Sequence, residues 1–242
     1  MLSKTKREIQ MPQTILAEVL SIEAATNFVN IVKLKPLIPA EFQAGQYLQI
    51  VLSEEDKRIF SIASAPDAEV IELHIGAGPD DSYPRGALDH MSVNREVILE
   101  VGLGNAHIQT SSDRPIILMA GGTGFSYTKS IADHLTSIKA TTPVILYWGV
   151  KEESALYARA EMETWAASHS HFEFIPVVEN PSTQWQGKTG YVHQAVMNDI
   201  KDLAPYDIYL AGPFKMAGIA REDFINKGAI KERIFADAFA YI

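Results

Sequence analysis

The sequence predicts a two-domain protein: an antiparallel β-barrel or sandwich, followed by an α/β unit built on a parallel sheet. In the first half, short β-branched segments lie between Pro, Gly or charged residues. In the second half, continuous apolar runs alternate with helix-length segments. Regular short strands favour a barrel or sandwich, whereas buried strands alternating with helices favour βαβ units. We place the boundary near the polar stretch Ser111–Arg114, which gives a polar extension (1–12), a first domain (13–110) and a second domain (111–242).

The elements of the first domain follow from length and composition. Its six apolar segments have the length and β-branched content of strands. They are Ile15–Ile22, Val29–Leu34, Tyr47–Leu52, Ile59–Ile62, Val70–Ile75 and Val97–Val101. One helix is expected at Pro84–Met91, because proline suits the first turn of a helix.

The second domain contains four apolar runs of the kind found in strands that are buried on both faces. These runs are Pro115–Ala120, Pro143–Gly149, Phe172–Val178 and Asp207–Ala211. Helix-length segments follow the first, second and fourth runs, at Phe125–Ile138, Ala155–Ala167 and Lys215–Lys227.

Composition excludes several classes of function. The chain carries 21 Lys and Arg against 30 Asp and Glu, and this net charge of -9 disfavours nucleic acid and anionic membranes as partners. It has no cysteine, which excludes disulfides, iron–sulfur clusters and a cysteine nucleophile in these 242 residues. We assign no metal ligands. Met1–Gln10 lacks the apolar run of a secretory signal, and no segment is long enough to span a membrane, so we expect a cytoplasmic protein.

A glycine-rich turn follows the first predicted parallel strand. Gly121-Gly122-Thr123-Gly124 lies directly before a helix-length segment. Glycines let the backbone turn sharply near a ligand, and the next helix directs free N–H groups at an anion. The spacing departs from G-x-G-x-x-G, because Tyr127 stands where the last glycine would fall. We favour a dinucleotide pyrophosphate site here over a purely structural turn.

Two further segments gain meaning in combination. Arg58-Ile59-Phe60-Ser61 lies on a predicted barrel strand, where period-two alternation lets Ser61 face a ligand while Phe60 packs. Taken alone, it is more typical of an ordinary strand. Gly212-Pro213 forms a second strand-to-helix corner on the same sheet edge as the first glycine turn, because parallel strands share their carboxyl ends. By itself this corner fits a plain helix start equally well.

The order and spacing of seven motifs are more specific than any single one. The motifs are Ala44-Gly45-Gln46-Tyr47, Arg58-Ile59-Phe60-Ser61, Glu72-Leu73-His74-Ile75-Gly76, Gly121–Tyr127, Tyr147-Trp148-Gly149, Gly212–Met216 and Asp237–Ile242. From about Ile15 to Ile242 the chain resembles the ferredoxin–NADP reductase superfamily. Within it, the chain is most similar to bacterial NAD(P)H–flavin oxidoreductases, including those of bioluminescence operons.

This resemblance implies a six-stranded antiparallel flavin-binding barrel, an NAD(P)H-binding α/β domain and a flavin in the cleft between them. It implies that the Ser61 hydroxyl bonds flavin N5, the hydride acceptor, which makes Ser61 the catalytic residue. The implied flavin-binding residues are Arg58, Phe60, Ser61, Ile62, Ala63, His74, Gly76, Phe239 and Tyr241. The implied nicotinamide-nucleotide residues are Gly121, Gly122, Thr123, Gly124, Tyr147, Trp148, Gly149, Gly212, Pro213, Phe214 and Met216.

The chain departs from the superfamily at two places. Members that hold FAD permanently carry a Gly-x-x-Ser phosphate loop where this chain reads Gly76-Ala77-Gly78-Pro79-Asp80-Asp81. The acidic pair is poorly suited to a pyrophosphate, so we expect riboflavin, FMN or FAD to bind as a dissociable substrate. Ala211 replaces the cysteine that precedes Gly-Pro in many members.

The expected reaction is hydride transfer from NADH or NADPH to a flavin, supplying reduced flavin to a consumer such as a monooxygenase or luciferase. One alternative is a reductase component that keeps FAD bound and passes electrons to a protein partner such as a monooxygenase. A second is a non-catalytic nucleotide-binding module. The choice between NADH and NADPH stays open, because Lys151 either meets a 2′-phosphate or faces solvent.

Overall fold

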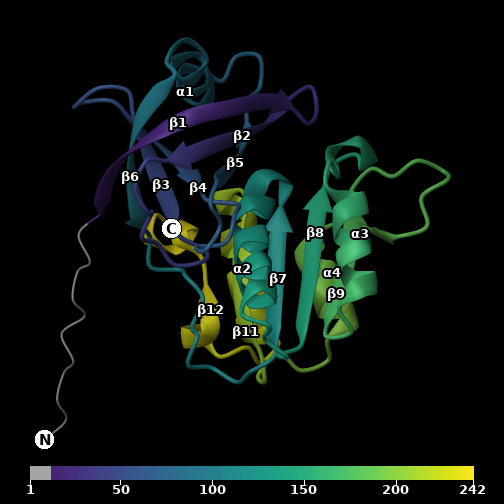
Figure 1. The fold of residues 1–242 in the computed structure, drawn as a ribbon. Helices are drawn as coiled ribbons and strands as arrows, with labels where there is room; N and C mark the ends of the chain where they lie inside the picture. Colours follow the sequence, from purple (N-terminus) through teal and green to yellow (C-terminus); the bar gives the residue numbers. More distant parts are fainter. Residues whose placement is uncertain (1–11) are drawn as a thin grey trace, which may run out of the picture.

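The computed structural model describes residues 12–242, and residues 1–11 of the predicted N-terminal extension lie outside the described part. Figure 1 shows two sheets, with the sheet of the first half lying beyond the carboxyl ends of the parallel strands of the second half. The ligand edge of the parallel sheet therefore faces the first sheet.

The first sheet is an antiparallel, nearly closed barrel of six strands in the order β4-β3-β6-β1-β2-β5. Its strands are β1 (Gln13–Ala24), β2 (Val29–Pro36), β3 (Tyr47–Val51), β4 (Lys57–Ser61), β5 (Ile71–Gly76) and β6 (Glu96–Leu103). The edge strands β4 and β5 meet at one antiparallel bridge between Ile62 and Leu73. The Ala63 N–H also donates to the Glu72 carbonyl over 2.7 Å. The sequence left barrel and sandwich open, and the barrel implied by the resemblance is confirmed.

Helix α1 (Ser82–Val93) lies between β5 and β6 in the chain and packs on the barrel core. Its residues Ala87 and Met91 are buried in the same cluster as the inward-facing residues of the six strands. Four-residue spacing places these two side chains on one face of the helix. The helix extends the predicted Pro84–Met91 by two residues at each end.

The second sheet is parallel, with six strands in the order β10-β9-β8-β7-β11-β12. Its strands are β7 (Ile116–Gly121), β8 (Val144–Val150), β9 (Phe172–Val178), β10 (Lys188–Thr189), β11 (Asp207–Ala211) and β12 (Ile234–Phe235). Its α-helices are α2 (Phe125–Ser137), α3 (Arg159–Ser168), α4 (Val192–Asp199) and α5 (Phe214–Asn226). Short 3₁₀ turns are η1 (Gly122–Gly124), η2 (Glu153–Ala155), η3 (Lys231–Arg233) and η4 (Asp237–Ala240).

Alternate residues of β7 enter two separate cores. Leu118 and Ala120 pack with α2 on one face of the sheet, whereas Ile117 and Met119 pack with α4 and α5 on the other. All six residues of β7 are buried. This double burial is why the strand reads as a continuous apolar run in the sequence.

Three features of the second half differ from the sequence prediction. The helix expected from Ala155 begins at Arg159, because η2 forms a separate turn before it. Helix α4 was not predicted, and neither were the two-residue strands β10 and β12. The fold therefore has two more parallel strands than the four expected.

The chain passes between the two sheets in the segment that joins Leu103 of β6 to Ile116 of β7. We retain a division at residues 110 and 111 as a proposal, since it falls within this segment. Within residues 12–242, no helix combines the length and the apolar character needed to cross a bilayer.

Candidate active site between the barrel and the parallel sheet

One cleft, with a volume of about 1570 Å³, lies between the barrel and the carboxyl edge of the parallel sheet. Its barrel wall includes the ends of β4 and β5, the β1–β2 turn and the start of α1. Its sheet wall includes the segments that follow β7, β8, β9 and β11. Pockets for one drug-sized ligand have volumes of about 300–1,000 Å³, so this cleft has room for two flat ligands.

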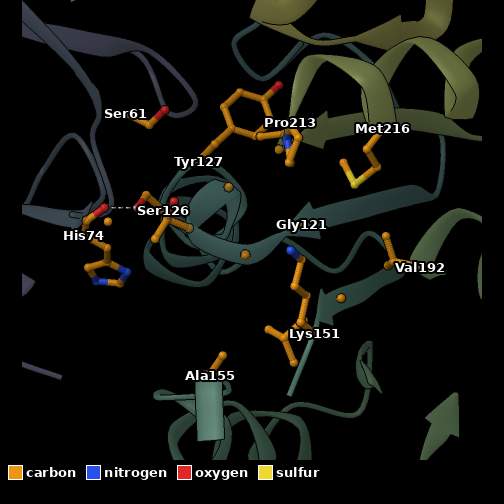
Figure 2. A pocket seen from close by; sticks show the side chains of 18 of the residues that line it. Ser61, His74, Gly121, Ser126, Tyr127, Lys151, Ala155, Val192, Pro213 and Met216 are labelled. Atoms are coloured by element: carbon orange, nitrogen blue, oxygen red, sulfur yellow. Dashed lines mark hydrogen bonds between the residues drawn. The ribbon is translucent and has the colours of Figure 1, made fainter. Parts of the chain in front are cut away.

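The barrel wall presents the Ser61 hydroxyl. Ser61 is the last residue of β4 and pairs with Tyr47 of β3. Figure 2 shows its side chain on the barrel side, directed into the space in front of the glycine loop. Phe60 also lines the cleft, and its ring lies 6.2 Å from that of Tyr83. Phe60 and Ser61 are adjacent residues, and both reach the cleft because β4 is an edge strand that ends there.

The conformation of the glycine loop at η1 is fixed by residues that pack against it. Gly122 has φ +56°, a left-handed conformation that favours glycine, and a Cβ added there would meet open space. The indole Nε1 of Trp148 donates to the Gly122 carbonyl over 2.9 Å, and the indole stacks on Phe125 at 3.9 Å. A Cβ on Gly124 would lie 2.5 Å from the carbonyl carbon of Ala211. The loop is therefore held by packing before any ligand arrives.

The barrel and the glycine loop come into close contact at Gly76. A Cβ added to this last residue of β5 would lie 3.1 Å from Cγ2 of Thr123 in η1. A contact this short leaves room for the Gly76 hydrogen atom but little room for a methyl group. The absence of a side chain at Gly76 therefore allows the two walls to lie this close.

Met216 of α5 covers the second glycine corner. Cβ atoms added to Gly121 and Gly212 would each lie 2.6 Å from the Met216 side chain, from Sδ and Cε respectively. Figure 2 shows Met216 and Pro213 on the same side of the cleft, next to Gly121. The thioether is apolar and adaptable, so it suits contact with a flat ring.

A buried polar network joins the two walls behind the cleft. His74 Nε2 lies 2.8 Å from Glu72 Oε1, and His74 Nδ1 lies 3.0 Å from the Tyr157 hydroxyl. Lys129 of α2 lies 3.5 Å from the same Glu72 oxygen. Burial alone would raise the pKa of Glu72, but the His74 hydrogen bond and the Lys129 charge lower it to about 2. This charged cluster fixes β5 of the barrel against the α/β half.

Asp237, from η4, also lines the cleft. Burial raises the pKa of its carboxyl group to about 6, and hydrogen bonds from the N–H groups of Ala106 and Asn105 limit that rise. Burial, then the nearby Tyr241 hydroxyl and the Asp237 carboxyl group, raise the pKa of Tyr47, the strand partner of Ser61. The cleft is therefore lined by a carboxyl group whose pKa lies well above the ordinary carboxyl value.

Most of the predicted site residues line this cleft. They are Phe60, Ser61, His74, Gly76, Gly121, Gly122, Thr123, Gly124, Gly149, Gly212, Pro213, Phe214 and Met216.

Three predicted flavin-binding residues lie in the barrel outside this lining. Arg58 is held by Asp56, with Nη2 2.6 Å from Oδ2, and its guanidinium lies 4.7 Å from the centre of the Tyr83 ring. Ile62 and Ala63 are fully buried. Their N–H groups donate to barrel carbonyls over 3.2 and 2.7 Å. Roles for these residues at the flavin stay predictions.

Four other predicted residues lie around the cleft, outside its lining. Tyr147 is buried on the α4 side, where its hydroxyl donates to Asp199 over 3.2 Å, and Trp148 lies beneath the glycine loop. Phe239 packs under the Arg221 guanidinium at 4.9 Å. Tyr241 stacks on Phe214 at 5.6 Å, so it borders the cleft through that ring. Direct ligand contact by these four stays a prediction.

Sequence reasoning missed several lining residues. Asp237 was part of a recognised motif, but its role depends on burial against the barrel, which has no local signal. Tyr191, Val192 and His193 line the cleft at the start of α4. Apolar residues at Val192, Ala195 and Val196 have the spacing of a buried helix face, and this signal was available.

Comparisons with known proteins agree with this geometry. A family model for the oxidoreductase NAD-binding domain matches residues 118–222. The chain is 47% identical over 236 residues to an NAD(P)H-flavin reductase of Aliivibrio fischeri, covering 94% of this chain and 99% of that protein. It is 45% identical over 237 residues to an NAD(P)H-flavin reductase of Vibrio harveyi, covering 95% of this chain and 100% of that protein.

A solved structure of the ferredoxin reductase in carbazole 1,9a-dioxygenase superposes with a TM-score of 0.81 at 27% identity. The match covers 94% of this chain and 70% of that one. Such identity to two curated reductases over nearly the whole chain, on a barrel and parallel sheet that share one cleft, shows that the chain belongs to the NAD(P)H-flavin reductase family.

Proposed function

We propose that the protein transfers a hydride from a reduced nicotinamide nucleotide to N5 of a flavin that binds and leaves as a substrate. One observation carries this proposal: a single cleft has the Ser61 hydroxyl on its barrel wall and two glycine corners on its sheet wall. A hydrogen-bond donor for a flavin ring thus lies opposite backbone suited to a dinucleotide.

The nicotinamide supplies the hydride and the flavin accepts it, so the electronic chemistry belongs to the two ligands. The chain contributes position. Holding two rings in one cleft replaces a bimolecular encounter and lowers the barrier by on the order of 7–11 kcal/mol. The Ser61 hydroxyl donates to N5 and stabilises charge that develops there.

Two features of the barrel support a flavin that dissociates. The segment after β5 places the Asp81 carboxylate at the cleft, where it repels a flavin phosphate. The nearest arginine on β4, Arg58, is already paired with Asp56. A flavin tail therefore finds little positive charge on this wall.

We also propose that the protein works in the cytoplasm and that the reduced flavin it releases is consumed by a second protein, a monooxygenase or a luciferase. A reductase that delivers a diffusible product needs no docking surface for its consumer. The test is coupling: reduced flavin made anaerobically by this protein should cross a dialysis membrane and support such an enzyme once O₂ is added to the compartment that holds the enzyme.

The proposed function is tested by flavin retention and turnover. The purified chain is dialysed, its flavin content is measured, and oxidation of NADH and NADPH is followed with added riboflavin, FMN or FAD. We expect far less than one flavin per chain and oxidation that saturates with added flavin. Stoichiometric FAD after dialysis, with electrons passing only to a protein acceptor, would instead favour a reductase component. Nucleotide binding without any oxidation would favour a non-catalytic module.

A further inference from the structure

We propose that the adenosine end of the cleft selects NADH over NADPH, through the carboxylates of Glu152 and Glu179, while Lys151 serves the pyrophosphate of either nucleotide. This inference rests on the proposed function, because it assigns a specificity to the same cleft. It concerns residues at the ends of β8 and β9, which lie on the side of β7 away from β11.

The order of the strands assigns the two ends of the dinucleotide. Neighbouring strands run β9-β8-β7-β11, and each is followed by residues that line the cleft. The nicotinamide must reach the flavin near Ser61, and the barrel meets the sheet wall at Thr123, after β7. With the pyrophosphate on the glycine loop, we place the adenosine half on the β8 and β9 side, because the Met216 side chain fills the space beside Gly121 and Gly212 on the β11 side.

The residues at that end are acidic. Glu152 follows β8 and Glu179 follows β9, and both line the cleft. The Asn180 side chain donates to Glu152 Oε1 over 3.4 Å, which orients that carboxylate. A carboxylate in this position accepts hydrogen bonds from a ribose 2′-hydroxyl, whereas it repels a 2′-phosphate.

The nearby cation does not offset these carboxylates. Figure 2 shows the Lys151 side chain extending from the end of β8 toward Gly121, the start of the glycine loop. Within residues 12–242, the Lys and Arg residues that line the cleft are Lys151 and Lys215. Lys215 lies on α5, beyond the Gly212 corner and on the opposite side of β7. The charge of Lys151 therefore acts at the pyrophosphate, which both nucleotides share.

His193 gives a second, independent sign of a nucleoside at this end. It lines the cleft and is only 6% exposed, yet its Nδ1 makes no hydrogen bond with any described residue. Burial lowers the pKa of this imidazole, although Asp223 opposes the shift, and this direction disfavours a positive charge on the ring. The exposed Tyr191 ring stacks on it at 5.9 Å and adds an aromatic face.

The test compares the two nucleotides on the same protein. Values of kcat/KM for NADH and NADPH are measured at one saturating flavin, and Kd values for NAD⁺ and NADP⁺ are measured by calorimetry without flavin. We expect both measurements to favour the unphosphorylated nucleotide by about tenfold to a hundredfold, since exposed like charges repel through screening solvent.

Variants separate the roles of the charged residues. Glu152→Gln and Glu179→Gln should each reduce the preference severalfold, chiefly by lowering KM for NADPH, and the double variant should bring it near unity. Lys151→Met should weaken both nucleotides by the same factor and leave their ratio unchanged. Glu173→Gln removes the same charge from the exposed side of β9, outside the cleft lining, and should change nothing.

Wild-type ratios within twofold of one, by rate and by Kd, would overturn the inference. So would a Lys151→Met variant that loses only NADPH, because Lys151 would then bind the 2′-phosphate. A protein that binds NAD⁺ better than NADP⁺ but oxidises neither reduced form with any flavin would refute the proposed function and leave the inference standing.

Discussion

The two walls of the cleft are built by different means. The barrel wall presents a side-chain group, the Ser61 hydroxyl, at the end of a strand. The sheet wall presents mainly backbone, and at Gly121, Gly124 and Gly212 side chains are missing because other atoms need the space. A substitution at Ser61 therefore deletes a chemical group, whereas one at Gly121, Gly124 or Gly212 adds atoms where none fit. The two walls call for opposite kinds of mutation.

The largest effect is expected where an added atom would meet backbone. Gly124→Ala places a Cβ 2.5 Å from the Ala211 carbonyl carbon, so η1 must shift away from β11. We expect a loss of about 3 kcal/mol in unfolding free energy, together with weakened NAD⁺ binding. Urea unfolding and calorimetry measure these quantities. Gly78→Ala is the matched control, because its Cβ meets nothing within 4 Å and should change stability by less than about 0.5 kcal/mol.

The next effect is expected from deletion on the barrel wall. Ser61→Ala should lower turnover by about tenfold to a hundredfold, the scale of one positioned hydrogen bond. The KM for NADH should hardly change, because Ser61 faces the flavin side, and Ser61→Thr should restore part of the rate. Steady-state kinetics decide the matter, and wild-type turnover in Ser61→Ala would remove this residue from the mechanism.

Asp237 is an exception to this contrast between the walls, because it lines the cleft with a side-chain group but comes from the sheet half. Its folded pKa of about 6 lies above the ordinary carboxyl value, so its contribution to stability is present at low pH and is lost as pH rises through 6. The variant Asp237→Asn cannot ionise at this position, so it does not show this loss of stability with rising pH. We expect the unfolding free energy of the variant, relative to wild type, to rise by about 1–2 kcal/mol between pH 4 and pH 8, allowing for solvent screening. Parallel urea titrations that show a constant difference would contradict the assignment.

The smallest effect is expected where the two walls touch. Gly76→Ala brings a methyl group 3.1 Å from Cγ2 of Thr123, which must yield by a few tenths of an ångström. We expect turnover to fall about threefold, because the walls separate slightly and the two rings align less well. Thr123→Ser removes the opposing methyl group, so the double variant should recover. If the double variant stays as slow as Gly76→Ala, the contact between residues 76 and 123 does not control the distance between the two walls.

The sequence predicted those parts of the fold whose signal is local. Strands β7 and β8 were found because burial on both faces leaves an unbroken apolar run. Strands β10 and β12 have two residues each, which is too short for any periodicity to register. Helix α4 has eight residues and follows a polar segment, so its apolar spacing at Val192 and Val196 was easily overlooked.

The same division applies to the site. The glycine corners and Ser61 stand in recognisable local motifs, and the structure brings them to one cleft. The chemistry of Asp237 and His193 arises from burial against segments distant in the chain, and no local pattern encodes it. Trp148 shows how far a local motif can predict a site. Its motif indicated nearness to the nucleotide, but its position beneath the loop depends on stacking with Phe125.

That indole has a practical consequence. Its ring is fully buried, and its N–H is tied to the carbonyl of Gly122. The other two tryptophans, Trp165 and Trp185, are not among the residues that line the cleft. Any ligand that displaces the loop by a fraction of an ångström changes the surroundings of Trp148. The intrinsic fluorescence of this tryptophan should therefore report ligand binding in the cleft.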